Sequence, residues 1–375
     1  MMTLKHFFRS LSLRFLFVSL ICFTIFSCTD HVNPPEEPDE DETVYVGGSL
    51  ESKLYAFNAA TGTKKWEFLA GDLIFSSPTV ASGIVYIGSA DGRLYAVDAV
   101  TGIKKWEFIA GYNILSCPTV TNGLVYFGSD KLYALDALTG VKKWEFDQSI
   151  YKTWFNPTVS NDIVYAIDYR KLYALNAKTG GKIWEFTSVE GFAPNPTVVN
   201  GVVYVGGDKL YALDAQTGIK KWEFMIGTFF QDRNFIGNPT VANGIVYVTT
   251  PFNLYALDAL TGTKKWELGR DVGRSSSPIV ANGIVYSGNG SKLYAVDALT
   301  GAEKWKFTAG DFVKDPTIGN GVVYVSSEDR KLYAIDAITG AKKWESITGD
   351  KLYSSPCVVT KKGVVYHPGL SGDQQ

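Results

Sequence analysis

The amino-acid sequence predicts an all-β fold, an eight-bladed β-propeller of four-stranded antiparallel blades. The main observation is an eleven-residue unit, Ala-x-Asp/Asn-x-x-Thr-Gly-x-x-x-Trp, which recurs eight times with tryptophans 38 to 44 residues apart. Each interval contains four short apolar segments separated by turn residues. The two ends of the chain carry complementary parts of one repeat. About 40 residues with four strands is the size of one propeller blade.

The second repeat illustrates the expected strands, which are residues 76–80, 84–88, 94–97 and 104–108. The two middle segments are apolar on both faces, as expected for strands that lie between neighbouring blades. In the last segment Trp106 and Phe108 share one face, and Lys105 and Glu107 share the other. We therefore expect it to be the outer strand, where lysine also protects the open edge from pairing with another chain.

The ends of the chain are expected to close the ring in one composite blade. The first repeat lacks its leading Ser-Ser-Pro strand, and the C-terminal part supplies a spare one at residues 354–359. Two Val-Tyr segments, residues 44–47 and 364–367, could take the second position in this blade. The sequence leaves both alternatives open.

The Asp or Asn and the Gly of each unit are the residues that a tight turn requires. Glycine adopts a left-handed backbone conformation without strain, and an Asp side chain accepts hydrogen bonds from the turn. We interpret these residues as turn chemistry and not as catalysts, because a propeller distributes equivalent positions around its rim.

The eleven-residue unit resembles the tryptophan-docking motif of the pyrroloquinoline-quinone (PQQ)-like propeller repeat family. That family includes quinoprotein alcohol dehydrogenases and a propeller lipoprotein of the outer-membrane β-barrel assembly machinery. The resemblance covers about residues 43–367 and implies that each tryptophan packs over the turn of the neighbouring blade. It is much less specific for function than for fold. The docking residues would be Trp66, Trp106, Trp144, Trp184, Trp222, Trp266, Trp305 and Trp344.

The first 28 residues are predicted to be a lipoprotein signal peptide. Lys5, Arg9 and Arg14 precede an apolar run of twelve residues, 15–26, which is shorter than a transmembrane helix needs. The run ends at a Ser-Cys pair that resembles a lipobox, so Cys28 is the expected site of acylation. The alternative is an ordinary cleaved signal. Residues 29–42 are acidic and proline-rich and are expected to form a tether, followed by the propeller at 43–367 and a tail at 368–375.

Charge and composition restrict the function. The net charge is −2, with three cations in the signal and seven acids in residues 29–42, which leaves the propeller close to neutral. Nucleic-acid binding normally needs a clustered basic face, so no nucleic-acid partner is expected. The three histidines, His6, His31 and His367, lie outside the repeats, and no metal site is expected. Cys117 and Cys357 belong to blades that are not neighbours, and we expect two free thiols.

The variable residues gather on one face of the predicted propeller. Uniform turns join strands one to two and strands three to four, whereas the loops on the other face differ in every repeat. Loops on a rigid scaffold usually carry binding, and interfaces favour aromatic residues and arginine. The predicted binding residues are Tyr151, Trp154, Phe155, Arg170, Phe229, Phe230, Arg233, Arg274, Lys314 and Arg330. Phe235 and Arg270 are expected beside them.

These observations favour a non-catalytic, monomeric binding scaffold, lipid-anchored on the extracytoplasmic side of a bacterial membrane. The resemblance implies protein partners, with outer-membrane protein assembly as the role. The alternative is an extracytoplasmic propeller that senses or binds glycan or peptide. A PQQ-dependent dehydrogenase is less favoured, because the adjacent Cys-Cys pair that those enzymes carry beside their cofactor is missing from this sequence. We therefore expect neither PQQ nor calcium as a cofactor, and no catalytic residues.

Overall fold

The computed structural model describes residues 42–48, 51–148, 155–189, 191–193, 195–225, 237–270, 273–360 and 365–366. All of them belong to one compact unit, Pro35–Gln375. Throughout these ranges the secondary structure is β-strand, turn and loop. No helix suited to crossing a membrane is found in the part of the chain so described.

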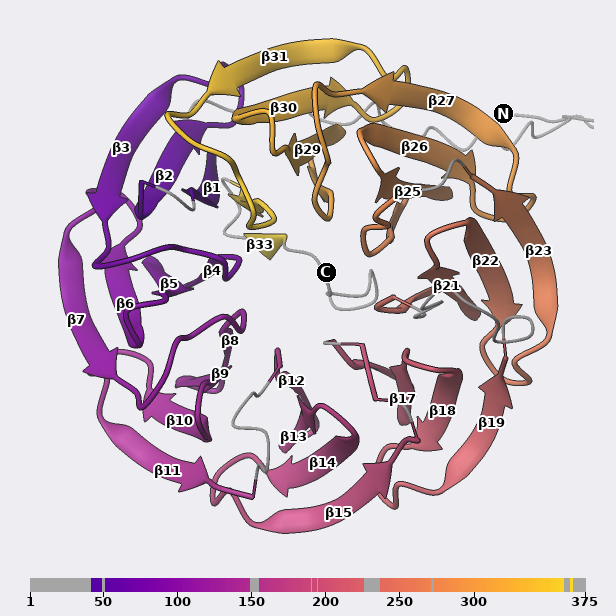
Figure 1. Ribbon diagram of the computed structural model, residues 1–375, viewed down its shortest axis with the longest axis horizontal. Coiled ribbons are helices and arrows are strands. Elements are labelled where there is room, and N and C mark those ends of the chain that lie inside the picture. The colour runs from indigo at the N-terminus through magenta and orange to yellow at the C-terminus, as the bar shows by residue number, and fades with distance from the viewer. Residues whose placement is uncertain are drawn as a thin grey trace, which may run out of the picture. The chain divides into compact units, whose positions relative to one another are not determined.

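The strands form eight antiparallel sheets arranged as the blades of a ring, with the fourth strand of each blade outermost (Figure 1). This confirms the predicted eight-bladed propeller. Blade 2 consists of β4 (Thr79–Ala81), β5 (Ile84–Gly88), β6 (Arg93–Asp98) and β7 (Lys104–Ile109). Blade 3 consists of β8 (Thr119–Thr121), β9 (Leu124–Gly128), β10 (Leu132–Asp136) and β11 (Lys142–Phe146). Blade 4 consists of β12 (Thr158–Ser160), β13 (Ile163–Asp168), β14 (Lys171–Asn176) and β15 (Lys182–Thr187). Blade 5 consists of β16 (Thr197–Val199), β17 (Val202–Val205), β18 (Leu210–Asp214) and β19 (Lys220–Phe224). Blade 6 consists of β20 (Thr240–Ala242), β21 (Ile245–Thr249), β22 (Asn253–Asp258) and β23 (Lys264–Gly269). Blade 7 consists of β24 (Ile279–Ala281), β25 (Ile284–Asn289), β26 (Lys292–Asp297) and β27 (Glu303–Thr308). Blade 8 consists of β28 (Thr317–Gly319), β29 (Val322–Ser326), β30 (Lys331–Asp336) and β31 (Lys342–Ile347).

Blade 1 is the composite blade, and it differs from the expected four strands. Its order is β3-β2-β1-β32-β33, formed by β1 (Thr43–Gly48), β2 (Lys53–Asn58), β3 (Lys64–Leu69), β32 (Cys357–Val359) and β33 (Val365–Tyr366). The N-terminal β1 takes the second position, because it pairs with β2 on one edge and with β32 on the other. The second Val-Tyr segment, β33, adds a fifth strand to the inner edge. This resolves the question that the sequence left open.

The first strand of each ordinary blade is only three residues long. The repeat proline directly precedes it and has no N–H to donate to a ladder. In blade 2 the segment before the proline is held by a side chain instead: the Ser76 hydroxyl donates to the Gly88 carbonyl and accepts from the Gly88 N–H. The inner strands are therefore shorter than the apolar pattern predicts.

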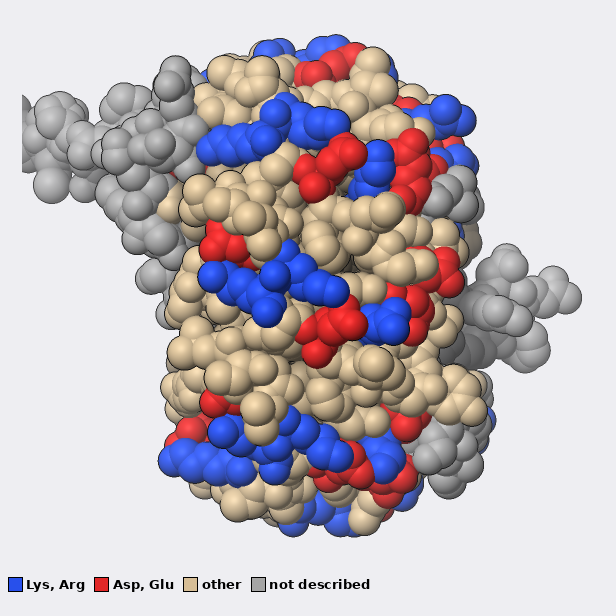
Figure 2. Space-filling view, turned by 90° about the vertical axis from the view of Figure 1, so that its left-hand side faces the viewer, with Lys and Arg blue, Asp and Glu red and all other residues tan. Residues whose placement is uncertain are grey.

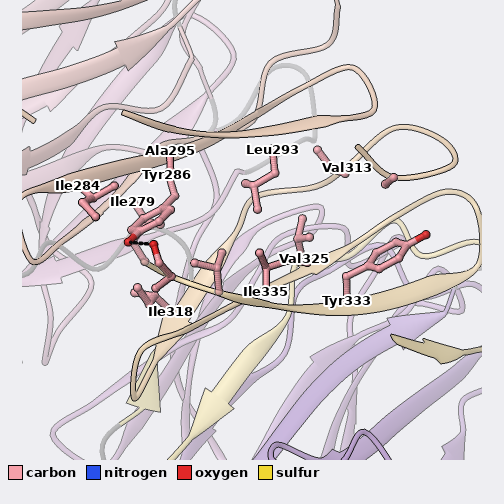
Figure 3. Packing of buried hydrophobic residues seen from close by; sticks show 13 residues of the cluster. Ile279, Ile284, Tyr286, Leu293, Ala295, Val313, Ile318, Val325, Tyr333 and Ile335 are labelled. Atoms are coloured by element: carbon pink, nitrogen blue, oxygen red, sulfur yellow. Dashed lines mark hydrogen bonds between the residues drawn. The ribbon is translucent and has the colours of Figure 1, made fainter. Parts of the chain in front are cut away.

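The hydrophobic core consists of eight slabs, one between each pair of neighbouring blades. Figure 3 shows the slab between blades 7 and 8, where Ile279, Tyr286 and Leu293 face Val325 and Ile335. The corresponding slabs occur around the whole ring. Both faces of the two middle strands are thus buried, as the sequence predicts.

Each blade is linked to the next through one backbone carbonyl, that of the alanine after the Asp or Asn of the turn. In blade 1 the Trp66 indole N–H donates to the Ala99 carbonyl of blade 2 at 3.1 Å, and the Tyr45 hydroxyl donates to the same oxygen at 2.9 Å. The same pair of bonds occurs at all eight junctions. The last junction, from Trp344 and Tyr324 to Ala59, closes the ring.

The turn that carries this carbonyl is built by its own side chains. In blade 2 the Asp98 carboxylate accepts hydrogen bonds from the Val100 and Thr101 N–H groups and from the Thr101 hydroxyl. The Thr101 N–H above all, then the Lys105 ammonium, and the other turn bonds lower the pKa of Asp98 to about 2. The asparagines of blades 1 and 4, Asn58 and Asn176, accept the same three bonds. The Asp and Asn residues of the unit therefore act as turn residues.

The turn glycines are predicted to be more sensitive than other glycines of the same conformation. Gly140 and Gly123 have φ angles of 73° and 75°, but a Cβ on Gly140 would lie 2.7 Å from the Trp106 ring, whereas a Cβ on Gly123 would meet nothing within 4 Å. Both Gly→Ala variants lose about 1–2 kcal/mol from the left-handed backbone. Gly140→Ala loses about 1–3 kcal/mol more, because the tryptophan must shift. Urea unfolding of the two variants measures the difference, and equal losses would contradict this account of the turn.

The turn aspartates predict acid sensitivity. A carboxylate whose pKa is lowered in the folded state stabilises the fold above its unfolded pKa of about 3.9, and this contribution is lost as the pH falls through the folded value. Stability should therefore fall between about pH 4 and pH 2. Asp98→Asn keeps the acceptor and should reduce the change between these two pH values. Asp98→Ala removes the acceptor and should cost about 1 kcal/mol at pH 7. Thermal unfolding at pH 7, at about pH 4 and at about pH 2 tests both predictions. A pH response of Asp98→Asn equal to that of the unmodified chain would show that another group is responsible.

Candidate binding face

The two ends of the blades carry different connections. The short turns between strands one and two and between strands three and four lie together, because the Ala99 N–H donates to the Gly83 carbonyl. At the opposite end, the connection between blades meets the loop between strands two and three, where the Ala90 N–H donates to the Leu73 carbonyl. We call these ends the turn face and the loop face. The variable connections that the structure describes lie on the loop face.

The structure describes half of the predicted binding residues. Phe155, Arg170, Arg274, Lys314 and Arg330 are described. The other five lie outside the described residues; they are Tyr151, Trp154, Phe229, Phe230 and Arg233. The predicted acylation site Cys28 also lies outside the described residues.

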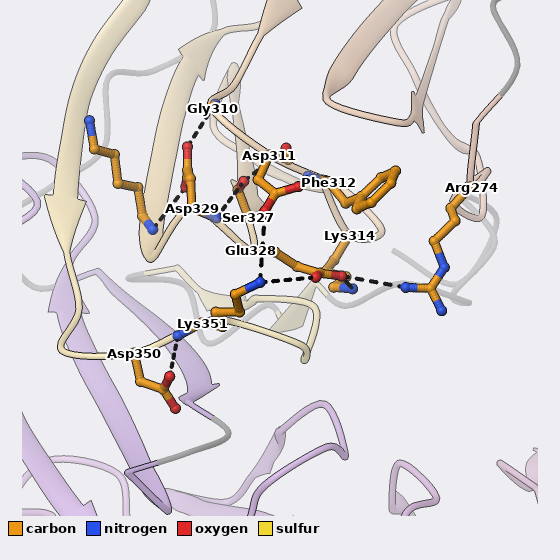
Figure 4. Close-up of polar contacts among 11 residues, drawn as sticks. Arg274, Gly310, Asp311, Phe312, Lys314, Ser327, Glu328, Asp329, Asp350 and Lys351 are labelled. Carbon is orange, nitrogen blue, oxygen red and sulfur yellow. Dashed lines mark hydrogen bonds and ion pairs between the residues drawn. The ribbon is translucent and has the colours of Figure 1, made fainter.

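Arg274 and Lys314 come together around one buried carboxylate. Glu328, in the loop between β29 and β30, has only 7% of its surface exposed. Its carboxylate lies 2.7 Å from the Lys314 ammonium, 3.5 Å from the Arg274 guanidinium and 3.9 Å from the Lys351 ammonium (Figure 4). Three cations from three different connections thus share one acid. The arrangement orders the cationic groups on the loop face, and Lys351 also lies 3.9 Å from the Asp311 carboxylate.

Aromatic rings lie beside these cations. The Arg274 guanidinium lies 5.9 Å from the ring centroid of Phe312, and the Lys314 ammonium lies 4.8 Å from that of Tyr353. The Tyr353 ring in turn lies 5.9 Å from that of Phe75. Phe75 and Phe312 are each 37% exposed, and the Arg274 side chain is 73% exposed. We call Arg274, Phe312, Lys314, Glu328, Lys351, Tyr353 and Phe75 the cation–aromatic cluster.

Sequence reasoning missed Glu328, Lys351, Tyr353, Phe312 and Phe75. A signal was present for two of them: Phe75 and Tyr353 occupy the same repeat position, directly before a Ser-Ser-Pro segment. The others lie in connections that share no pattern with their counterparts. Only the ring geometry brings them together.

The remaining described residues are placed separately. Arg170 is exposed, and its guanidinium lies over the Tyr169 ring at 5.6 Å. Arg330 is exposed at a strained φ of 73°. Phe155 is half-buried and packs against the core slab between blades 4 and 5, so its ring serves the core.

Arg270 differs most from the expectation that it would lie beside the binding residues. Its guanidinium donates to the Ser287 hydroxyl at 2.8 Å and to the carbonyls of Thr250 and Asn253. Burial lowers its pKa to about 10. It crosslinks the connections of blades 6 and 7 and serves the scaffold.

A polar ring lies beside the first strands of the blades and is formed by the residue before each repeat proline. These side chains link neighbouring blades: Asn156 donates to Asn195, Asn238 donates to Ser277, and Asp315 accepts from the Ser277 N–H. Burial raises the pKa of the Asp315 carboxyl and of the Cys117 thiol. The ring consists of Ser77, Cys117, Asn156, Asn195, Asn238, Ser277, Asp315 and Ser355.

The donors of this ring do not fit a quinone cofactor with its calcium ion. The ring offers one carboxylate, and its amides bond to their neighbours. Its one thiol, Cys117, and the buried Cys357 of blade 1 are both free, as expected. Within the described ranges no three His, Cys, Asp or Glu side chains are grouped so that they could hold a metal ion.

Lys314 and Arg274 are the two cations of the cation–aromatic cluster that the sequence predicted as binding residues. Replacing them should have unequal effects on the free energy of unfolding. Lys314→Met leaves the buried Glu328 carboxylate without its closest partner and should cost about 2–3 kcal/mol of unfolding free energy. Arg274→Met removes a largely exposed partner and should cost less than about 1 kcal/mol. Urea unfolding gives both values. Adding Glu328→Gln to Lys314→Met should restore part of the loss, and a further loss on adding it would refute the proposed pairing.

Comparisons with known proteins agree with the fold. A family model described as outer membrane protein assembly factor BamB matches residues 34–145, 152–228, 169–308 and 253–372. Among curated proteins, no sequence matches the chain.

Several solved structures share the propeller. The crystal structure of BamB from Moraxella catarrhalis has a TM-score of 0.60 and 18% identity, over 78% of this chain and 88% of that chain. The quinohemoprotein alcohol dehydrogenase from Comamonas testosteroni has a TM-score of 0.64 and 16% identity, over 84% and 70%. The dihydro-heme d1 dehydrogenase NirN has a TM-score of 0.69 and 14% identity, over 86% and 76%. At these identities the structures show the fold alone. The family model, which spans most of the chain, shows more: the chain belongs to the PQQ-like propeller family described as outer membrane protein assembly factor BamB.

Proposed function

We propose that the protein is a non-catalytic binding scaffold, whose loop face holds protein partners in outer-membrane protein assembly. The observation that carries the proposal is the cation–aromatic cluster. It combines exposed aromatic rings and an exposed arginine, both enriched at protein interfaces, on a scaffold that fixes their positions. The family membership supports the assembly role.

The proposed location is the extracytoplasmic side of a bacterial membrane, with the chain anchored through acylated Cys28. The sequence of residues 1–28 supports this, because a basic segment, a short apolar run and a Ser-Cys pair follow one another. A monomeric propeller is proposed, since the ring closes within one chain.

We propose that the protein acts without PQQ, calcium or another cofactor. The polar ring supports this because it offers a single carboxylate. The absence of a Cys-Cys pair from the sequence supports it as well. Adding PQQ with Ca²⁺ to the purified protein should give neither a shift in quinone absorption nor dye-linked oxidation of alcohols. Either signal would overturn the non-catalytic assignment.

The binding role predicts loss of partners when the cluster is changed. Arg274→Glu combined with Phe312→Ser should abolish co-purification of outer-membrane β-barrel assembly proteins from detergent-solubilised membranes, because it reverses one charge and removes one exposed ring. A matched control is Leu69→Ser with Ile109→Ser, two outer-wall side chains that are 66% and 65% exposed. Mass spectrometry identifies the captured proteins.

The control should capture the same assembly proteins as the unmodified chain. Deletion of the gene should also lower porin levels in the outer membrane. Normal porin levels, together with no assembly protein in the capture, would favour the propeller that binds glycan or peptide instead.

A further inference from the structure

The turn face carries exposed aliphatic side chains in six of its eight blades. The residue before the Thr-Gly pair of the turn is aliphatic and exposed in five blades: Val100 (82%), Leu138 (66%), Leu260 (85%), Leu299 (74%) and Ile338 (62%). Three more directly follow the turn glycine, namely Ile103, Val141 and Ile219, which are 58–68% exposed. We call these eight residues the apolar crown. Single exposed apolar residues are ordinary on a protein surface, but here eight of them occupy equivalent turns on one face of the propeller.

The fold does not require apolar residues at these positions. Lys178 and Gln216 stand at the corresponding position in blades 4 and 5, and their N–H groups donate to the turn Asn or Asp as in the other blades. The turns themselves are held by the Asp or Asn side chain and by the shared alanine carbonyl. Because the position is equivalent in each repeat, the aliphatic tips lie at a common level around the rim.

Lysines lie directly behind the crown on the outer wall. In blade 2 the Lys105 ammonium lies 3.0 Å from the turn carboxylate of Asp98, and five other blades have the equivalent pair. Figure 2 shows the cationic and acidic patches that repeat from blade to blade along this wall. In seven outer strands the glutamate follows the tryptophan and is thus farther from the turn, whereas in blade 7 Glu303 precedes it. In five blades two lysines therefore lie near the crown beside one turn aspartate.

The chain enters the propeller at this same face. Thr43, the first residue of β1, pairs with Asn58 at the start of a turn, and the Glu42 carbonyl accepts from the Ala59 N–H. The described part of the chain therefore begins at the turn face. Cys28 lies 14 residues upstream of Glu42, a length that spans at most about 50 Å when extended. An anchor at Cys28 would hold the turn face within reach of a membrane.

We propose that the apolar crown rests on the surface of an anionic phospholipid bilayer, with the aliphatic tips among the headgroups and the lysines against the lipid phosphates. Separate Val, Leu and Ile tips suit a fluid surface, whereas a protein partner favours a clustered aromatic anchor. The proposal takes its orientation from the proposed anchor at Cys28. It does not depend on the proposed assembly role.

The test is vesicle binding by the chain from residue 28 onward with Cys28→Ser, so that no acyl chain contributes. Vesicles of phosphatidylethanolamine and phosphatidylglycerol are sedimented with this chain, with a crown variant (Val100→Ser, Leu260→Ser, Leu299→Ser) and with a wall variant (Leu69→Ser, Ile109→Ser, Ile347→Ser). The wall residues are 65–76% exposed and lie at the other end of the outer strands. Thermal unfolding verifies that all three chains are folded.

The crown variant should bind the vesicles about tenfold or more weakly than its parent, and the wall variant should bind within about twofold of it. Binding should weaken in high salt. Absence of binding by the parent chain, or equal losses in both variants, would overturn the proposal. So would a parent dimer, seen by light scattering, that the crown variant dissociates, because the crown would then join two copies. No partner protein is present, so failure of the assembly role leaves this result unaffected.

Discussion

One backbone carbonyl per blade holds the ring together. It accepts both the indole N–H and the tyrosine hydroxyl of the preceding blade, at 2.9–3.2 Å, as at Ala137 and Ala177. The tyrosines are buried, and burial raises the pKa of Tyr86 and Tyr126 to about 12, so each hydroxyl remains a neutral donor. A buried hydroxyl without an acceptor costs about 1–3 kcal/mol. Because two donors depend on this carbonyl, the turn that presents it must keep its conformation. This one requirement explains why Asp or Asn, glycine and tryptophan occur together in one unit.

This constraint divides the molecule into a uniform half and a variable half. All the residues that build the junction lie on the turn face or beside it, so the connections on the loop face can vary without disturbing the contacts between blades. The cation–aromatic cluster uses that freedom. Its carboxylate, Glu328, is buried in a loop, and burying an acid there is costly unless cations accompany it. Lys314, Arg274 and Lys351 accompany it, which makes the cluster ordered although it is built from irregular connections.

The sequence predicted the fold well because each relevant interaction recurs eight times. The number of blades, the outer tryptophan strand and the closure by both chain ends follow from the repeat alone. Two features could not be predicted from it. The position of β1 depends on its pairing with both β2 and β32, and two identical Val-Tyr segments compete for that pairing. The partnership of Lys314 with Glu328 depends on loops without a common pattern, and Arg270, which resembles a surface cation in sequence, is drawn into the scaffold by the carbonyls of blade 6.

The proposed anchor and the proposed binding role would give the two faces of the ring different tasks. The proposed tether would pull on β1, which has hydrogen-bonded neighbours on both edges, and not on an exposed edge strand. Force from a membrane anchor would thus be distributed through β2 and β32, the strands that the N-terminal and C-terminal parts of the chain contribute to closure. If the turn face rests on the membrane as proposed, the opposite loop face would point away from it. The cation–aromatic cluster would then be presented where a partner can approach it without displacing lipid.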